Sequence, residues 1–167
     1  MTILETKRLT LEELTESHFS DLYKLLSNEN VQKYFPKALN QEETLEFLHE
    51  VISRYRQDGV CFWAVTLKEN KTFIGICGIL KQIIEGKEEF EIAYRISDIY
   101  WGRGYGTEAA KGCLDYAKDI LGKKSVISLI KDVNKASIRV AEKNGLEFIK
   151  VVVFDGLPHN LYRKNFD

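Results

Sequence analysis

The chain has 167 residues, of which 44% are hydrophobic and 29% charged, and its formal net charge is −1 at pH 7. This length suits one domain over residues 1–167, and the balanced charge argues against a nucleic-acid partner, which would call for a basic face. No run of roughly 18 apolar residues occurs, so no membrane partner is expected. The amino end has no apolar signal core, which favours a cytoplasmic location.

The three cysteines, Cys61, Cys77 and Cys113, are widely spaced and form neither a CxxC motif nor a zinc-binding pattern. No metal site is therefore expected. All three have apolar neighbours, which predicts small buried core residues in a reducing compartment.

The amino-terminal third predicts a strand followed by two helices. Residues 8–14 alternate in hydrophobicity and read as the strand. Apolar residues then recur at helical spacing, as Phe19, Leu22, Tyr23 and Leu26 in the first helix and as Leu45, Leu48, Ile52 and Tyr55 in the second. Pro36 separates the two helices, Asn40 can cap the second, and Gly59 ends it.

The middle of the chain changes to the period of strands. Residues 60–67, 72–80 and 90–97 are rich in β-formers, and polar turns at 68–71 and 85–88 join them. The order then becomes a helix after the glycine stretch, an apolar strand at 125–130, a short helix at 134–144 and two closing strands. This β-α-α-β-β-β-α-β-α-β-β order indicates a mixed sheet with helices packed against it.

The segment YWGRGYGTEAAKG, residues 100–112, places three glycines directly before a helix-forming run. A helix amino end leaves backbone N–H groups unpaired and carries a partial positive charge. Glycines let a ligand approach those groups without meeting a Cβ, which favours an anion such as phosphate, and Arg103 could add a charge. The alternative is a simple glycine-rich turn. Neither a P-loop nor a complete dinucleotide motif is present.

The segment NKAS, residues 134–137, opens the helix after the next strand. An Asn in this position is often only a helix cap. Here, however, a strand, a glycine loop and a helix precede a second strand and a second helix that starts with Asn.

With these motifs the chain resembles the GNAT acetyltransferases, and within them the Rim-like branch of ribosomal-protein N-terminal acetyltransferases. The resemblance runs from ETKRLTLEEL through YWGRGYGTEAAKGCLDYA and DVNKASIRVAEKNGLEF to the final strands. It implies an α/β (α+β) fold: a mixed, mostly antiparallel seven-stranded sheet, splayed in the middle, with helices on both faces. It also implies acetyl-CoA as cosubstrate.

The resemblance assigns the cofactor contacts residue by residue. The pyrophosphate would rest on the glycine loop, namely Trp101, Gly102, Arg103, Gly104, Tyr105, Gly106 and Thr107. The backbone of Tyr94, Arg95 and Ile96 would pair with the pantetheine arm, while Asn134 and Ser137 would reach the arm or the thioester.

The catalytic assignments are Glu91 and Ser137. Many relatives carry a Tyr that protonates the leaving thiolate, but the matching position here is about Ala141, so Ser137 is a possible substitute. Glu91, on the strand beside the cofactor, could take the proton of the amine; the alternative is an exposed strand residue. No Cys–His arrangement supports a covalent intermediate, so direct transfer is expected.

The acceptor is expected to be a primary amine, of a peptide amino terminus or of a small molecule. Tyr34 and Phe35 could wall its pocket, or they could be ordinary core residues. Two other functions stay open: a dedicated polyamine or antibiotic acetyltransferase, and a CoA-binding regulatory module with little turnover. An exposed strand edge or helix face could also support a homodimer.

Overall fold

A computed structural model describes residues 1–167. Eight strands form one sheet in the order β1-β2-β3-β4-β5-β6-β8-β7. The strands are β1 (Thr2–Glu5), β2 (Leu9–Glu13), β3 (Phe62–Leu67), β4 (Phe73–Ile84), β5 (Lys87–Ile96), β6 (Ser125–Ile130), β7 (Glu147–Phe154) and β8 (Leu157–Asn165). The helices are α1 (Phe19–Leu26), α2 (Gln41–Asp58), α3 (Tyr105–Asp119) and α4 (Lys135–Lys143), with 3₁₀ turns at Glu16–His18 and Asp98–Tyr100.

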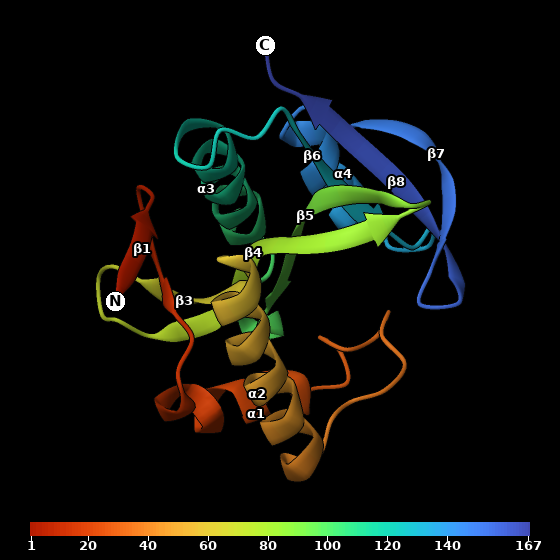
Figure 1. The fold of residues 1–167 in the computed structure, drawn as a ribbon. Coiled ribbons are helices and arrows are strands. Elements are labelled where there is room, and N and C mark those ends of the chain that lie inside the picture. Colours follow the sequence, from red (N-terminus) through yellow and green to blue (C-terminus); the bar gives the residue numbers. More distant parts are fainter.

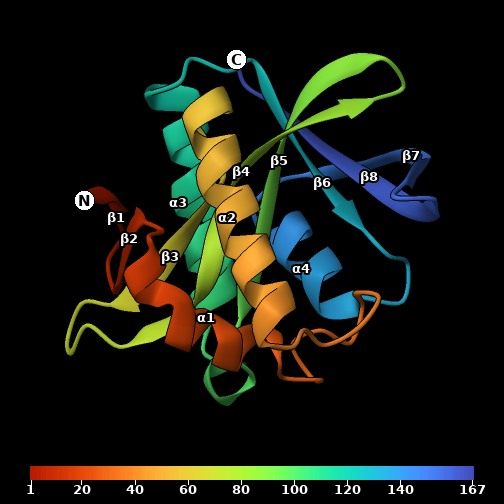
Figure 2. The same cartoon turned by 60° about the horizontal axis from the view of Figure 1, so that its bottom comes forward.

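Helices cover both faces of the sheet (Figure 1). Seen from below, α1 and α2 lie in front of the strands and α3 lies behind them (Figure 2). Two separate apolar cores follow from this arrangement: one joins the sheet to α3 and α4, and the other joins it to α1 and α2. None of the helices combines the length and hydropathy that a membrane crossing requires.

The local signals of the second helix are confirmed, with one correction. The Asn40 side chain caps α2 and forms a capping box with Glu43, and Gly59 ends the helix in the left-handed conformation with φ 76°. Leu45, predicted on the buried stripe, is 41% exposed, and Val51 is buried instead. The inward face of α2 is therefore rotated slightly from the predicted one.

The sheet opens between β5 and β6, the only parallel neighbours in it. Their register consists of the single pair Glu91 and Ile127, supported by a 3.1 Å hydrogen bond from Ser128 Oγ to the carbonyl of Ile92. Beyond these residues the two strands have no further paired positions, so the edge of β5 from Ala93 onward faces an opening. The carboxyl end of β5 leads to the glycine loop and α3, and that of β6 leads to α4.

The predicted fold class is confirmed, whereas the number of strands is eight rather than seven. The additional strand is β1, only four residues long, which pairs antiparallel with β2. Four residues of mixed exposure give no clear alternation, so only the contact with β2 defines this strand. The hairpin of β4 and β5 is also longer than predicted, because only Glu85 and Gly86 form its turn.

Candidate active site

The glycine loop adopts a backbone that only glycine accommodates well. Gly102 and Gly104 have φ values of 78° and 81°, and Gly104 is the N-cap residue of α3. A Cβ on Gly102 would meet no atom within 4 Å, so the space beside it is open. A Cβ on Gly106 would lie 3.3 Å from the ring of Tyr94, so this glycine permits close packing instead. The loop thus uses its glycines for two different reasons.

The backbone N–H groups from Gly102 to Thr107 donate no hydrogen bond within the chain. The first internal bond of α3 runs from Glu108 N to the carbonyl of Gly104, at 3.0 Å. A row of free N–H groups at the positive end of a helix favours an anionic ligand. Arg103, exposed next to this row, adds a positive charge.

Arg8 holds the loop in place, and the sequence did not predict this role. Its Nη1 donates to the carbonyl of Arg103 at 2.9 Å, its Nε donates to Glu108 Oε1 at 2.7 Å, and its guanidinium lies 4.3 Å from the ring centre of Tyr105. Burial alone would raise the pKa of Glu108, but hydrogen bonds from Thr6 and Arg8 lower that pKa overall. The amino-terminal strands therefore fix the start of α3.

Trp101 also supports the loop. Its Nε1 donates to the carbonyl of Ile96 at 2.8 Å, while the residue remains 53% exposed. This bond ties the loop to the end of β5. It also occupies the Ile96 carbonyl, one of the backbone groups predicted to pair with the pantetheine arm.

Tyr94 and Ser137 meet across the opening. The Tyr94 hydroxyl, from β5, donates to Ser137 Oγ, from α4, at 3.1 Å. Burial raises the pKa of Tyr94 to about 12, so the hydroxyl stays protonated near neutral pH. Asn134 accepts a hydrogen bond from Ser137 N at 3.2 Å and so acts as the cap of α4. Ala141 is buried, and no tyrosine stands at that position.

Glu91 lies on the opposite side of the sheet from Tyr94. Its carboxyl group accepts a 3.0 Å hydrogen bond from Gln82 Nε2, and the residue is 7% exposed. Burial raises its pKa from 4.5 to about 7, although the hydrogen bond from Gln82 acts in the other direction. The alternative reading of Glu91 as an exposed strand residue is therefore wrong.

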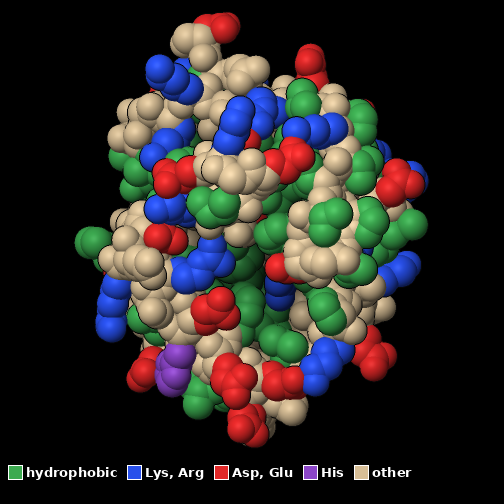
Figure 3. Space-filling view, turned by 45° about the vertical axis from the view of Figure 1, so that its right-hand side comes forward, with side chains coloured by type: hydrophobic (Ala, Val, Ile, Leu, Met, Phe, Trp, Pro, Cys, Tyr) green, Lys and Arg blue, Asp and Glu red, His purple; other side chains and the backbone are tan.

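Phe35 reaches this same side. Its ring centre lies 3.8 Å from the Arg95 guanidinium, and the residue is 37% exposed, so ordinary core packing does not describe it. Tyr34 is half-buried, and its ring makes a cation–π contact with Lys33 but none with Arg95. Figure 3 shows the side of the molecule that holds segment 27–40: hydrophobic side chains line a hollow with charged side chains around it.

Comparison with known proteins places this geometry in a family. The sequence model of the acetyltransferase (GNAT) domain matches residues 8–147. The YkkB protein of Bacillus subtilis is 34% identical over 168 residues, which cover 99% of this chain and 98% of YkkB. This chain belongs to the GNAT acetyltransferases.

Two solved acetyltransferase structures share its fold. One is from Agrobacterium tumefaciens, with a TM-score of 0.86 and 22% identity over 99% of this chain and 95% of the other. The second is RimL, a ribosomal L7/L12 α-N-protein acetyltransferase in complex with coenzyme A. Its TM-score is 0.80 at 18% identity, over 100% of this chain and 99% of RimL. The predicted family and the predicted enzyme class are confirmed.

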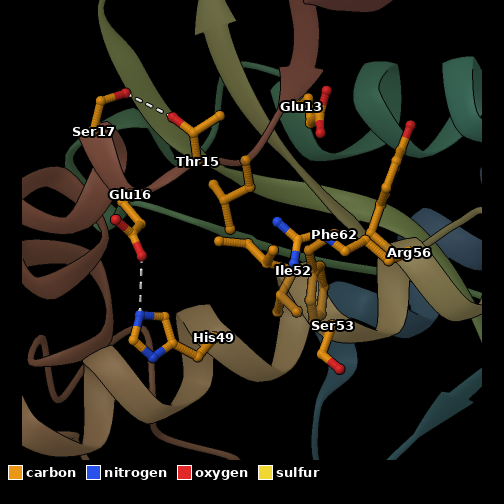
Figure 4. A pocket seen from close by; sticks show the side chains of 12 residues that line it. Glu13, Thr15, Glu16, Ser17, His49, Ile52, Ser53, Arg56 and Phe62 are labelled. Carbon is orange, nitrogen blue, oxygen red and sulfur yellow. Dashed lines mark hydrogen bonds and ion pairs between the residues drawn. The ribbon is translucent and has the colours of Figure 1, made fainter.

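The acetyltransferase has another hollow, of about 550 Å³, between the segment after β2 and helix α2 (Figure 4). Glu16 and His49 pair across its rim at 3.3 Å, and both side chains are exposed. None of the cofactor, catalytic or acceptor residues predicted from the sequence lines it. The free N–H row and the buried titratable groups lie instead at the opening between β5 and β6, and we place the candidate site there.

Proposed function

We propose that this GNAT protein transfers the acetyl group of acetyl-CoA directly to a primary amine, of a peptide amino terminus or of a small molecule. The observation that carries the proposal is the opening between β5 and β6, flanked by the amino ends of α3 and α4. The description of RimL, which has this fold and binds coenzyme A, supports it.

The residues at the opening suit a diphosphate attached to an extended arm. The free N–H groups of Gly102–Thr107 offer donors, and the open space beside Gly102 admits a bulky anion. The unpaired edge of β5 at Tyr94 could pair with an amide-containing arm, whereas the backbone of Arg95, also predicted to pair with it, faces Ile76 of β4. Asn134 keeps its side-chain NH₂ free, since only its oxygen is used as a cap.

Acetyl-CoA supplies an activated thioester, and the chain must manage two protons around it. An alkylammonium has a pKa of ~10.4, so the attacking amine has to lose a proton. Glu91, with a pKa of about 7, has an accessible ionised form at neutral pH and can accept that proton directly or through water. The new N–C bond then forms as the C–S bond breaks.

Ser137 can hold the proton that the departing sulfur takes up. Its Oγ accepts from the Tyr94 hydroxyl, so its own O–H remains free to donate. The Tyr94 hydroxyl can then donate a proton to Ser137 Oγ and so replace the one that Ser137 has lost. This pair can therefore serve in place of the tyrosine that is missing at Ala141.

The cysteines support direct transfer. Cys61, Cys77 and Cys113 are each no more than 1% exposed, and Cys77 and Cys113 face each other with sulfurs 3.5 Å apart. Burial raises the pKa values of Cys61 and Cys113, which disfavours the nucleophilic thiolate.

A matched pair of glycine variants tests the site. Gly102→Val and Gly156→Val place a branched residue at similar φ values, 78° and 74°, in equally open surroundings, but only Gly102 lies in the loop. Calorimetric titration should show the acetyl-CoA affinity of Gly102→Val falling about tenfold or more, while Gly156→Val binds as the wild type does. Equal affinity in both folded variants would remove the loop from the site.

Turnover is tested by measuring CoA release with acetyl-CoA and a panel of amines, and by identifying the acetylated product by mass. The absence of a tyrosine at Ala141 favours one rival, a regulatory module that binds CoA without turnover. Tight acetyl-CoA binding with no release of CoA for any amine would support that rival. Amine-dependent release would support the acetyltransferase.

A further inference from the structure

The side chain of Arg95 points to the face that carries Glu91, away from Tyr94. Side chains alternate along β5, so Glu91, Ala93 and Arg95 share one face, which α1 and α2 cover. The amine has to reach this face, because Glu91, the proposed base, lies there. Arg95 was predicted to act through its backbone alone, and its side chain is left without an assigned role.

The Arg95 guanidinium lies among aromatic rings with few hydrogen-bond partners. The ring centres of Phe35, Phe47 and Phe62 are 3.8, 5.2 and 5.8 Å away. The only hydrogen bond of the group runs from Nη1 to Gln32 Oε1 at 3.2 Å, and Nε is buried without a partner.

No carboxylate of the chain pairs with this guanidinium within 4.0 Å. Burial lowers the pKa of Arg95 to about 10, and the charge of Glu91 offsets this only in part. Arg95 is half-buried, and a positive charge partly withdrawn from water is costly unless an anion and hydrogen bonds compensate it. Aromatic rings attract the charge but leave the N–H donors unused.

We propose that Arg95 binds an anionic group, a carboxylate or a phosphate, carried by the acceptor amine. This inference rests on the proposed acetyl transfer and narrows its acceptor class. A planar guanidinium fork matches both anions, and the rings of Phe35 and Phe47 fix its orientation. Arg54, whose charge also acts on Glu91, makes this side more positive. These two arginine charges disfavour a polyamine acceptor, whose additional amines are cationic.

Matched pairs of amines, with and without an anionic group, provide the test. The pairs are β-alanine against β-alaninamide, phosphoethanolamine against ethanolamine, and the amidated dipeptides Ala–Glu against Ala–Gln. They separate a carboxylate from a phosphate and a free amine from a peptide terminus. CoA release should favour the anionic member of at least one pair by about tenfold or more in kcat/KM.

Three variants decide whether Arg95 causes that preference. Arg95→Gln should abolish the preference, and Arg95→Lys should keep part of it. The control Arg56→Gln removes an exposed charge from α2 and should leave the preference intact. Circular dichroism establishes whether each variant is folded. If Arg95→Gln does not fold, Arg95→Lys is used to test the preference in its place. A preference that survives the loss of Arg95, or equal rates within every pair, would overturn the inference but leave the acetyl transfer standing.

A binding measurement covers the case in which no amine is acetylated and the proposed function itself fails. The Arg95 Nε–H signal is followed in ¹H–¹⁵N spectra while β-alanine, phosphoethanolamine or their neutral partners are added in the presence of CoA. A saturable shift with an anionic probe only is expected. The absence of any shift would overturn the inference without reference to turnover.

Discussion

Replacing Glu91 with Gln should make the protein more stable at alkaline pH and less active. The isosteric Gln can keep the contact with Gln82 but carries no charge. Raising the pKa of Glu91 from 4.5 to about 7 costs its ionised form about 3 kcal/mol. Because the folded-state pKa is the higher one, the wild type has its full stability below pH 4.5 and loses about that amount as the pH rises to 7.

Chemical denaturation at several pH values measures this difference. The free energy of unfolding of Glu91→Gln should match that of the wild type near pH 4 and exceed it by up to about 3 kcal/mol at pH 8. Glu88→Gln, on the same strand but exposed, is the control and should show no such divergence. A Glu91→Gln protein that is less stable at pH 8, or a stability difference independent of pH, would refute the reasoning.

The same substitution should change the pH profile of turnover. A base with a pKa of about 7 gives a rate that rises with pH and reaches half of its plateau near pH 7. Glu91→Gln should lose that inflection and ~10²-fold or more in rate near neutral pH, with partial recovery at high pH, where more amine is already neutral. An unchanged profile would exclude Glu91 as the base.

Three other predictions concern the loop, the proton donor and the cysteines. Arg8→Ala should weaken acetyl-CoA binding about fivefold in calorimetric titration, because the hydrogen bonds that hold the loop, worth about 1 kcal/mol, are lost. The control Lys7→Ala, at the exposed neighbouring residue, should bind as the wild type does. Equal affinities of the two variants would contradict the role of Arg8. Ser137→Ala and Tyr94→Phe should each slow the single-turnover rate at saturating acetyl-CoA by ~10²-fold. If Ser137→Ala instead reduces acetyl-CoA affinity and leaves that rate alone, Ser137 only binds the arm. Mass spectrometry of the wild type during turnover should find no acetylated cysteine, and a kinetically competent acetyl-Cys would disprove direct transfer.

Most of the fold could be predicted because its signals are local. The capping box at Asn40, the left-handed glycine at Gly59 and the apolar run at 125–130 each depend on a few neighbouring residues. The glycine loop before α3 is also a local signal, since the positive φ values at Gly102 and Gly104 favour glycine. Strand β1 was missed because its partner β2 defines it.

The parts of the site that could not be predicted are contacts between distant segments. The side chains of Arg8 and Glu108 meet although 100 residues separate them, and those of Tyr94 and Ser137 meet across 43. Charged and hydroxyl side chains are common in any sequence, so none of these residues carries a local signal of its partner. Arg95 shows the same limit: its aromatic neighbours come from the segment before α2, from α2 and from β3.

Titration of the ¹⁵N-labelled protein with acetyl-CoA, followed by the backbone amide signals, tests the central claim most directly. The free N–H groups of Gly102–Thr107 should show the largest shifts, in the downfield direction expected for new hydrogen bonds to phosphate. Signals at Tyr94 and Asn134, on either side of the opening, should shift as well. Shifts concentrated instead at the hollow of Figure 4, around Glu16 and His49, or no shift in the glycine loop at saturation, would contradict the account.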